Sequence, residues 1–212
     1  PLMGTKSSEK VPLLLHTMIS DDREQNLRLA RQDAILSANI EVDGSEVFRR
    51  QPLQHRPPRL RIGYLTYDCR DHPMAHLMVN VMERHSRLDF HITCFSLGPD
   101  DGSAYRTRME GAVDEFVNGY GWSDAKLLET LHTHDIHILV DLMGLTRGQR
   151  MTVLSKRPAP IQVTWLGYPG TTGAEYIDYL IVDSTVVPEA HKESFSEQLA
   201  YLPTYQPNDD TL

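Results

Sequence analysis

The sequence predicts an α/β fold, a Rossmann-like unit in which a parallel sheet carries helices on both faces. From residue 60 onward, apolar runs typical of strands alternate with amphipathic stretches typical of single helices. The strand-like runs are rich in Val and Ile and are apolar on both faces, as strands buried in a parallel sheet are. Hydrophobic residues make up 40% of the chain, which is enough to build a substantial core.

The first 58 residues are expected to be linker helices and a connector. Apolar residues recur among polar ones between residues 11 and 42, which predicts two short helices, and Ser20, Asp21 and Asp22 offer an N-cap to the second. Residues 42–58 lose that periodicity and collect Arg, Gln and Pro, which marks a linker. The α/β domain itself is expected to occupy residues 59–212.

Within this domain, strands and helices are expected to follow one another along the chain. Strands are expected at residues 60–66, 90–97, 115–118, 136–142, 161–166 and 176–182. Helices are expected at residues 74–85, 105–112, 123–132 and 150–156. Single helices between successive strands predict parallel pairing rather than hairpins.

Composition and charge argue against several classes of protein. No apolar run approaches the roughly 18 residues that a membrane span needs, and no secretory signal pattern is expected at the N-terminus. The formal charge of −8 disfavours general affinity for nucleic acid, because binding to phosphates draws on clustered Lys and Arg. Cys69 and Cys94 are the only cysteines, which suits a reducing compartment. We therefore expect a cytoplasmic or nuclear protein with no membrane and no nucleic acid among its partners.

The loop after the first expected strand gathers polar side chains from Tyr67 to Pro73. In an open parallel sheet, ligands bind beyond the carboxyl ends of the strands, so this loop lies where a site forms. His72 is its main candidate, since an imidazole titrates near neutral pH and can exchange protons with a hydroxyl group. Pro73, in the first helical turn, would fix its direction. A histidine that only caps the helix or lies on the surface is the alternative.

Two later loops are expected at the same edge of the sheet. The stretch at residues 166–173 combines three glycines with two threonine hydroxyls and can offer backbone N–H groups to phosphate or sugar oxygens, although a plain tight turn fits as well. Its candidate binding residues are Tyr168, Pro169, Gly170 and Thr171. In the loop at residues 144–148, Thr146 is the candidate, with solvated polar groups as the alternative.

The histidines do not predict a metal site. His72 and His76 share a helix face, but the sequence offers neither the intervening Glu of a zinc-protease motif nor a third ligand by spacing. His134 and His137 lie three residues apart, and residues at that spacing in a strand do not share a face. A buried, hydrogen-bonded core histidine is the favoured interpretation of His137 from pattern alone.

Several motifs, in this order, resemble the catalytic region of the protein O-linked N-acetylglucosamine transferases. The matching stretches are DCRDHPMAHL at residues 68–77, PDDGS at 99–103, IHILV at 136–140, RPAPIQ at 157–162, WLGYPGTTG at 165–173 and EQLAYLP at 197–203. The resemblance covers essentially all of the chain after the connector. Residues 11–42 resemble the helices that join tetratricopeptide repeats to that catalytic region.

The resemblance implies a GT-B architecture, of which this chain would be the Rossmann-like N-terminal lobe, truncated before the second lobe. It implies inverting transfer of GlcNAc from UDP-GlcNAc to Ser or Thr hydroxyls of intracellular proteins, with no cofactor and no metal. It also assigns His72 and His137 to the active site. One departure is that His134 stands where family members often have Asp, and Asp135 follows one place later.

Two other functions remain open at this point. A sister branch of the family transfers fucose from GDP-fucose, but it lacks the proline that follows the histidine, so Pro73 favours the GlcNAc branch. A fragment of the enzyme that persists only as a non-catalytic scaffold is the third alternative.

Overall fold

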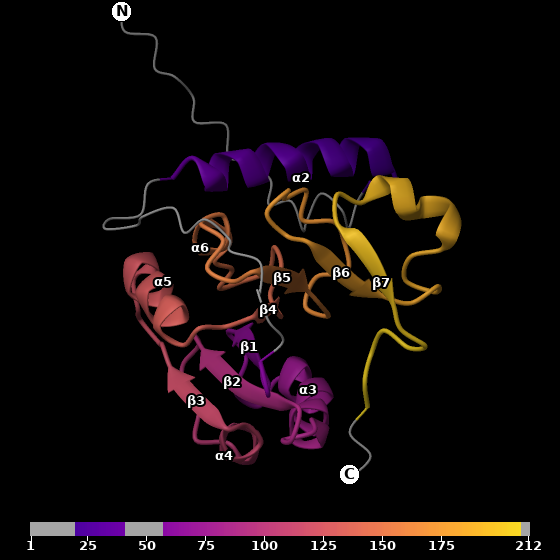
Figure 1. Ribbon diagram of the computed structural model, residues 1–212. Coiled ribbons are helices and arrows are strands. Elements are labelled where there is room, and N and C mark those ends of the chain that lie inside the picture. Colours follow the sequence, from indigo (N-terminus) through magenta and orange to yellow (C-terminus); the bar gives the residue numbers. More distant parts are fainter. Residues whose placement is uncertain (1–19, 41–56, 209–212) are drawn as a thin grey trace, which may run out of the picture.

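The computed structural model describes residues 20–40 and 57–208, which form a doubly wound α/β domain (Figure 1). The described strands make one sheet in the order β3-β2-β1-β4-β5-β6-β7, and every neighbouring pair is parallel. The strands are β1 (Leu60–Thr66), β2 (Phe90–Ser96), β3 (Glu115–Asn118), β4 (Ile138–Asp141), β5 (Ile161–Thr164), β6 (Tyr179–Val182) and β7 (Gln198–Tyr201). The expected parallel α/β sheet is confirmed.

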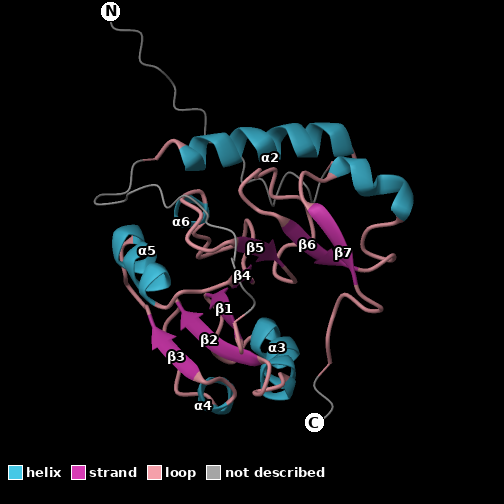
Figure 2. Cartoon of the chain, viewed as in Figure 1, coloured by secondary structure: helices cyan, strands magenta, loops and turns pink. Residues whose placement is uncertain are grey.

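Helices cover both faces of this sheet (Figure 2). They are α2 (Arg23–Ala38), α3 (Pro73–Arg84), α4 (Ala104–Gly111), α5 (Asp124–Thr133), the short α6 (Met151–Leu154) and the 3₁₀ helix η1 (Glu189–Ser194). Successive side chains of β1 pack into hydrophobic cores on opposite faces of the sheet. Tyr64 packs with α3 and α4, whereas Leu65 packs with α5 and α6. This alternation is why the strand reads as apolar on both faces.

Local capping explains where the helices begin. The side chain of Asp22 accepts a hydrogen bond from Gln25 N at 2.9 Å and starts α2, as the sequence predicts. Ser103 and Ser123 start α4 and α5 in the same way. The first helix expected within residues 11–42 falls largely on residues 11–19, and most of the connector on residues 41–56; both stretches lie outside the described residues.

Four expected strands are shorter than predicted, and one strand was missed. The strand expected at 90–97 ends one residue early, at Ser96. The strand expected at 136–142 begins only at Ile138, after the turn that Asp135 makes with φ 50°. The strand expected at 161–166 ends at Thr164, just before Leu166 adopts φ 73°. The strand expected at 176–182 starts at Tyr179, and β7 was not among the expected strands. Apolar side chains thus continue beyond the ladder hydrogen bonds, so hydrophobicity alone overestimated the strand lengths.

Helix α2 is packed on the domain through its small residues. Ala30 and Ala34 are its buried residues, and Ala34 joins the core that α5 and α6 share. Gly173 has φ +69°, and a Cβ atom there would lie 2.3 Å from the carbonyl carbon of Ala30. The close contact places α2 directly over the glycine-rich loop after β5. Among the described residues, no helix has the length and apolar character needed to cross a membrane.

Candidate active site

The loops after β1, β4 and β5 meet at the carboxyl edge of the sheet. The guanidinium of Arg147, in the loop after β4, lies 5.7 Å from the ring centre of Tyr67, in the loop after β1. A Cβ atom on Gly144 would lie 2.6 Å from Cβ of Tyr168. The backbone of the loop after β4 therefore packs directly against the Tyr168 side chain in the loop after β5. The arrangement matches the edge at which parallel sheets bind ligands.

His72 is both the cap of α3 and a partly exposed side chain. Its Nδ1 atom accepts a hydrogen bond from Met74 N at 3.2 Å, and Pro73 occupies the first turn of the helix. Because Nδ1 accepts, the neutral imidazole carries its proton on Nε2. The carboxylate of Asp68 lies 3.8 Å from Nδ1. His72 can therefore donate a hydrogen bond to a ligand from Nε2 while it caps the helix.

The loop that carries His72 is held by polar contacts on both sides. Asp71 N donates a hydrogen bond to the Asp101 carboxylate at 2.8 Å. His76 Nε2 lies 2.7 Å from Asp71 Oδ1, and its ring packs on Tyr105 with the centroids 4.0 Å apart. The bonds donated by Asp71 and Ser103 lower the pKa of Asp101 to about 2. His76 and Asp101 thus fix the loop, whereas the only hydrogen bond of His72 among the described residues uses Nδ1.

The loop after β4 is organised by a buried carboxylate. Asp141 accepts hydrogen bonds from Gly144 N at 2.8 Å and Met143 N at 3.2 Å. Burial raises the pKa of Asp141 to about 7, despite these two donors. Thr146, a predicted binding residue, donates its hydroxyl proton to Met143 O at 2.7 Å. Its oxygen can still accept a hydrogen bond from a ligand, but its proton is engaged within the loop.

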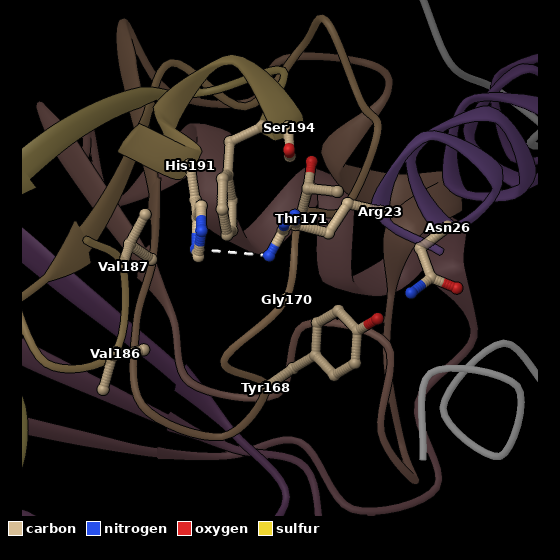
Figure 3. A pocket seen from close by; sticks show the side chains of 10 residues that line it. Arg23, Asn26, Tyr168, Gly170, Thr171, Val186, Val187, His191 and Ser194 are labelled. Atoms are coloured by element: carbon tan, nitrogen blue, oxygen red, sulfur yellow. Dashed lines mark hydrogen bonds between the residues drawn. The ribbon is translucent and has the colours of Figure 1, made fainter. Parts of the chain in front are cut away.

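A cavity of about 190 Å³ lies beside the glycine-rich loop (Figure 3). The predicted binding residues Tyr168, Gly170 and Thr171 line it, and Pro169 is exposed next to them. The other lining residues come from α2 and from the segment after β6; they are Arg23, Asn26, Val186, Val187, His191, Ser194 and Phe195. Arg23 Nη1 and His191 Nδ1 are 3.5 Å apart, the contact drawn as a dashed line in Figure 3.

These additional cavity residues could not be predicted from the sequence, for a physical reason. They lie far from the glycine-rich loop along the chain, and only the packing of α2 and η1 on the domain brings them to it. No local pattern marks Arg23 or His191, since a single basic residue in a helical turn is ordinary surface chemistry.

His137 lies at the opposite edge of the sheet from His72. It precedes β4, and its Nδ1 atom accepts a hydrogen bond from Arg61 N, near the start of β1, at 3.0 Å. Thr66, at the other end of β1, is five residues further on, roughly 16 Å along an extended strand. Burial lowers the pKa of His137, and its side chain is 8% exposed. The two candidate catalytic histidines are therefore not brought together, and His137 has the geometry of a hydrogen-bonded core histidine.

The described residues contain no group of three or more His, Cys, Asp or Glu side chains arranged to hold a metal ion. Cys69 and Cys94 are free thiols whose sulfur atoms lie 3.4 Å apart in the core. Metal-free, cofactor-free chemistry stays a prediction for the complete protein.

Comparisons with known proteins agree with this architecture. The model of glycosyl transferase family 41 matches residues 13–209. The probable UDP-N-acetylglucosamine--peptide N-acetylglucosaminyltransferase SEC of Arabidopsis thaliana is 39% identical over 145 residues, which are 68% of this chain and 15% of that protein. The UDP-N-acetylglucosamine--peptide N-acetylglucosaminyltransferase of Caenorhabditis elegans is 39% identical over 146 residues, 68% of this chain and 13% of that protein.

A solved structure extends the similarity to nearly the whole chain. A mutant of the Thermobaculum terrenum O-GlcNAc transferase superposes with a TM-score of 0.82 at 30% identity, covering 94% of this chain and 39% of that one. The chain thus spans well under half the length of each of these relatives. Sequence, sheet order and loop arrangement agree that the chain belongs to glycosyl transferase family 41.

Proposed function

We propose that the complete protein is an inverting O-GlcNAc transferase, which moves GlcNAc from UDP-GlcNAc to Ser or Thr hydroxyls of acceptor proteins. Residues 59–212 would form the N-terminal lobe of its GT-B catalytic region. The observation that carries the proposal is that the loop after β4 contacts both the loop that carries His72 and the glycine-rich loop, at the carboxyl edge of a family 41 sheet. The names of the Arabidopsis thaliana and Caenorhabditis elegans relatives support the choice of donor and acceptor.

The reaction makes two demands that these residues can help to meet. As the acceptor oxygen bonds to the anomeric carbon, its proton must leave, and the bond to the UDP oxygen breaks with charge developing on the diphosphate. His72 in its neutral form offers Nε2–H as a donor to that charge or to a sugar oxygen. We assign it an essential role on that basis, with Pro73 fixing the ring and Asp68 close to Nδ1.

Further binding roles belong to the two loops beside His72. We propose that Tyr168, Pro169, Gly170, Thr171 and Thr146 shape the donor and acceptor site together with the second lobe. His137 is left out of this site because of its position at the amino edge. We also propose a cytoplasmic or nuclear location. It is supported by Cys69 and Cys94, which form no disulfide although their sulfur atoms lie 3.4 Å apart, as suits a reducing compartment.

Transfer of fucose from GDP-fucose is the second candidate function, and Pro73 favours GlcNAc over it. A pocket that hydrogen-bonds the acetamido group would leave polar groups unpaired when fucose binds, which can cost several orders of magnitude in specificity. The test is an assay of the complete protein with both donors against one Ser/Thr-rich peptide. We expect faster turnover of UDP-GlcNAc; faster turnover of GDP-fucose would overturn the choice of sugar. Absence of transfer from both would favour a non-catalytic scaffold.

A further inference from the structure

Glu197 is a buried carboxylate at the start of β7 that no step of the proposed reaction uses. Its side chain is in the core, with the residue 5% exposed. Among the described residues it has no Lys, Arg or His partner within ion-pair distance. A charge removed from water without a counter-ion needs several good hydrogen bonds to compensate for its lost hydration.

Those hydrogen bonds all come from the glycine-rich loop. Thr171 donates its hydroxyl to Glu197 Oε2 at 2.7 Å, and Thr172 N donates to Oε1 at 2.7 Å. The hydroxyl of Thr172 donates to the same Oε1. One carboxylate thus holds two successive loop residues from a position 25 residues further along the chain.

The two threonines then organise the end of the loop. Their hydroxyl oxygens also accept hydrogen bonds from the backbone. Gly173 N donates to Thr171 Oγ1 at 3.1 Å, and Ala174 N donates to Thr172 Oγ1 at 3.3 Å. The N–H groups of residues 172–174 are therefore all engaged within the protein. This leaves the other half of the loop as the part able to serve a ligand.

The backbone N–H groups of Gly170 and Thr171 have no acceptor within the described part of the chain. Both residues line the cavity of Figure 3, at the carboxyl edge of β5. Two consecutive unengaged N–H groups can donate hydrogen bonds to an oxygen-rich or anionic ligand. Such a site works only if the loop backbone is held in one conformation before the ligand arrives.

We propose that Glu197 is a positioning residue that clamps Thr171 and Thr172, so that the N–H groups of Gly170 and Thr171 meet oxygen atoms of the nucleotide-sugar donor. The inference rests on the proposed function for the identity of the ligand. The clamp itself stands on the hydrogen bonds of the structure. Glu197 does not touch the reacting atoms and acts only through the loop.

The test compares variants of the complete protein. Glu197→Leu removes every acceptor, whereas Glu197→Gln keeps one oxygen for Thr172 N and gains an amide that can donate to a threonine hydroxyl. Glu175→Gln, at an exposed position of the same stretch, is the matched control. The measurements are KM and kcat for UDP-GlcNAc, and amide hydrogen exchange of residues 166–174 without donor.

For Glu197→Leu we expect KM for the donor to rise about tenfold or more, the scale of an unmade or misplaced pair of hydrogen bonds. Exchange at residues 172–174, whose N–H groups the clamp engages, should quicken while the central strands stay protected. Glu197→Gln should stay within about threefold of the parent KM, and Glu175→Gln should match the parent.

Several results would overturn the proposal. A purely structural role would lower the active fraction and kcat while leaving KM and loop exchange unchanged. Equal damage in Glu197→Gln and Glu197→Leu would also refute a clamp made of hydrogen bonds. If the parent protein transfers no sugar, the proposed function fails instead, and the exchange of residues 172–174 in Glu197→Leu still decides whether the clamp exists.

Discussion

His72 Nδ1 accepts the backbone N–H of Met74 across 3.2 Å, so one imidazole serves at once as a helix cap and as a candidate site residue. These two duties use different nitrogen atoms. A substitution can therefore remove one duty and keep the other.

We predict that His72→Ala lowers turnover of the complete enzyme by about 10² or more, the usual scale for losing a positioned proton donor or acceptor. His72→Asn should lose turnover to a similar extent but keep the melting temperature, because Asn is a good N-cap. His76→Ala should be milder, since His76 binds Asp71 and packs on Tyr105. Near-normal rates for both His72 variants would make His72 a cap alone.

Asp141 should make stability depend on pH. Burial raises its pKa from 3.8 to about 7, so the folded protein holds this proton more tightly than the unfolded chain does. The favourable contribution is complete below the unfolded pKa and is lost as pH rises through the folded pKa, by about 1.4 kcal/mol per pH unit at most.

The matching variant is Asp141→Asn, which we expect to melt higher than the parent at pH 8 and to show a smaller change in melting temperature between pH 5 and 8. The shift should be about 2–4 °C per kcal/mol for a chain of this size. Asp101→Asn is the control, because the pKa of Asp101 is lowered to about 2 and does not titrate in this interval. Parallel melting profiles for the parent and Asp141→Asn would show that the carboxylate is solvated.

Gly173→Ala should loosen α2. The new Cβ would lie 2.3 Å from backbone atoms of Ala30 and Arg31, so the helix would have to move. The loop would also have to accept a strained φ of +69° at an alanine. We expect the free energy of unfolding to fall by about 2 kcal/mol or more, which exceeds the roughly 1 kcal/mol that the left-handed conformation alone would cost. Gly102→Ala is the control, since Gly102 has φ +66° and no atom within 4 Å of a new Cβ. Similar melting temperatures for the two variants would contradict the contact with α2.

Residues 1–212 alone should neither bind UDP measurably nor transfer sugar. A cleft enzyme with one wall lacks the enclosing pocket and the water exclusion that strengthen its electrostatics. Calorimetry with UDP is the measurement. One-to-one binding in the micromolar range would show that this lobe holds the nucleotide by itself.

The sheet could be predicted from sequence because its signal is local. Apolar runs separated by single helices specify parallel strands, and β1 and β3 were placed with the bounds that the structure has. Strand ends depend on backbone turns such as that at Leu166, which hydrophobicity does not encode. β7 was missed because its burial is partial and its ends are exposed.

The candidate site divides in the same way. Loops that follow strands could be named in advance, since the carboxyl edge is a property of the topology. Positions that depend on long-range packing could not: Arg23 and Glu197 reach the glycine-rich loop only in the folded chain. The motif match grouped His137 with His72, whereas strand direction separates them across the sheet.

The contact between α2 and Gly173 joins two parts of the chain that are synthesised at very different times. The helix leaves the ribosome long before its partner loop is made, and at about 5–20 residues per second the interval is roughly 7–30 s. For most of that time, until α5 and α6 have been made, the face carrying Ala30 and Ala34 has no partner in the described part of this domain. An isolated helix of this length is marginal in water, so α2 is expected to stay unformed on the nascent chain and to fold last, although it is translated first.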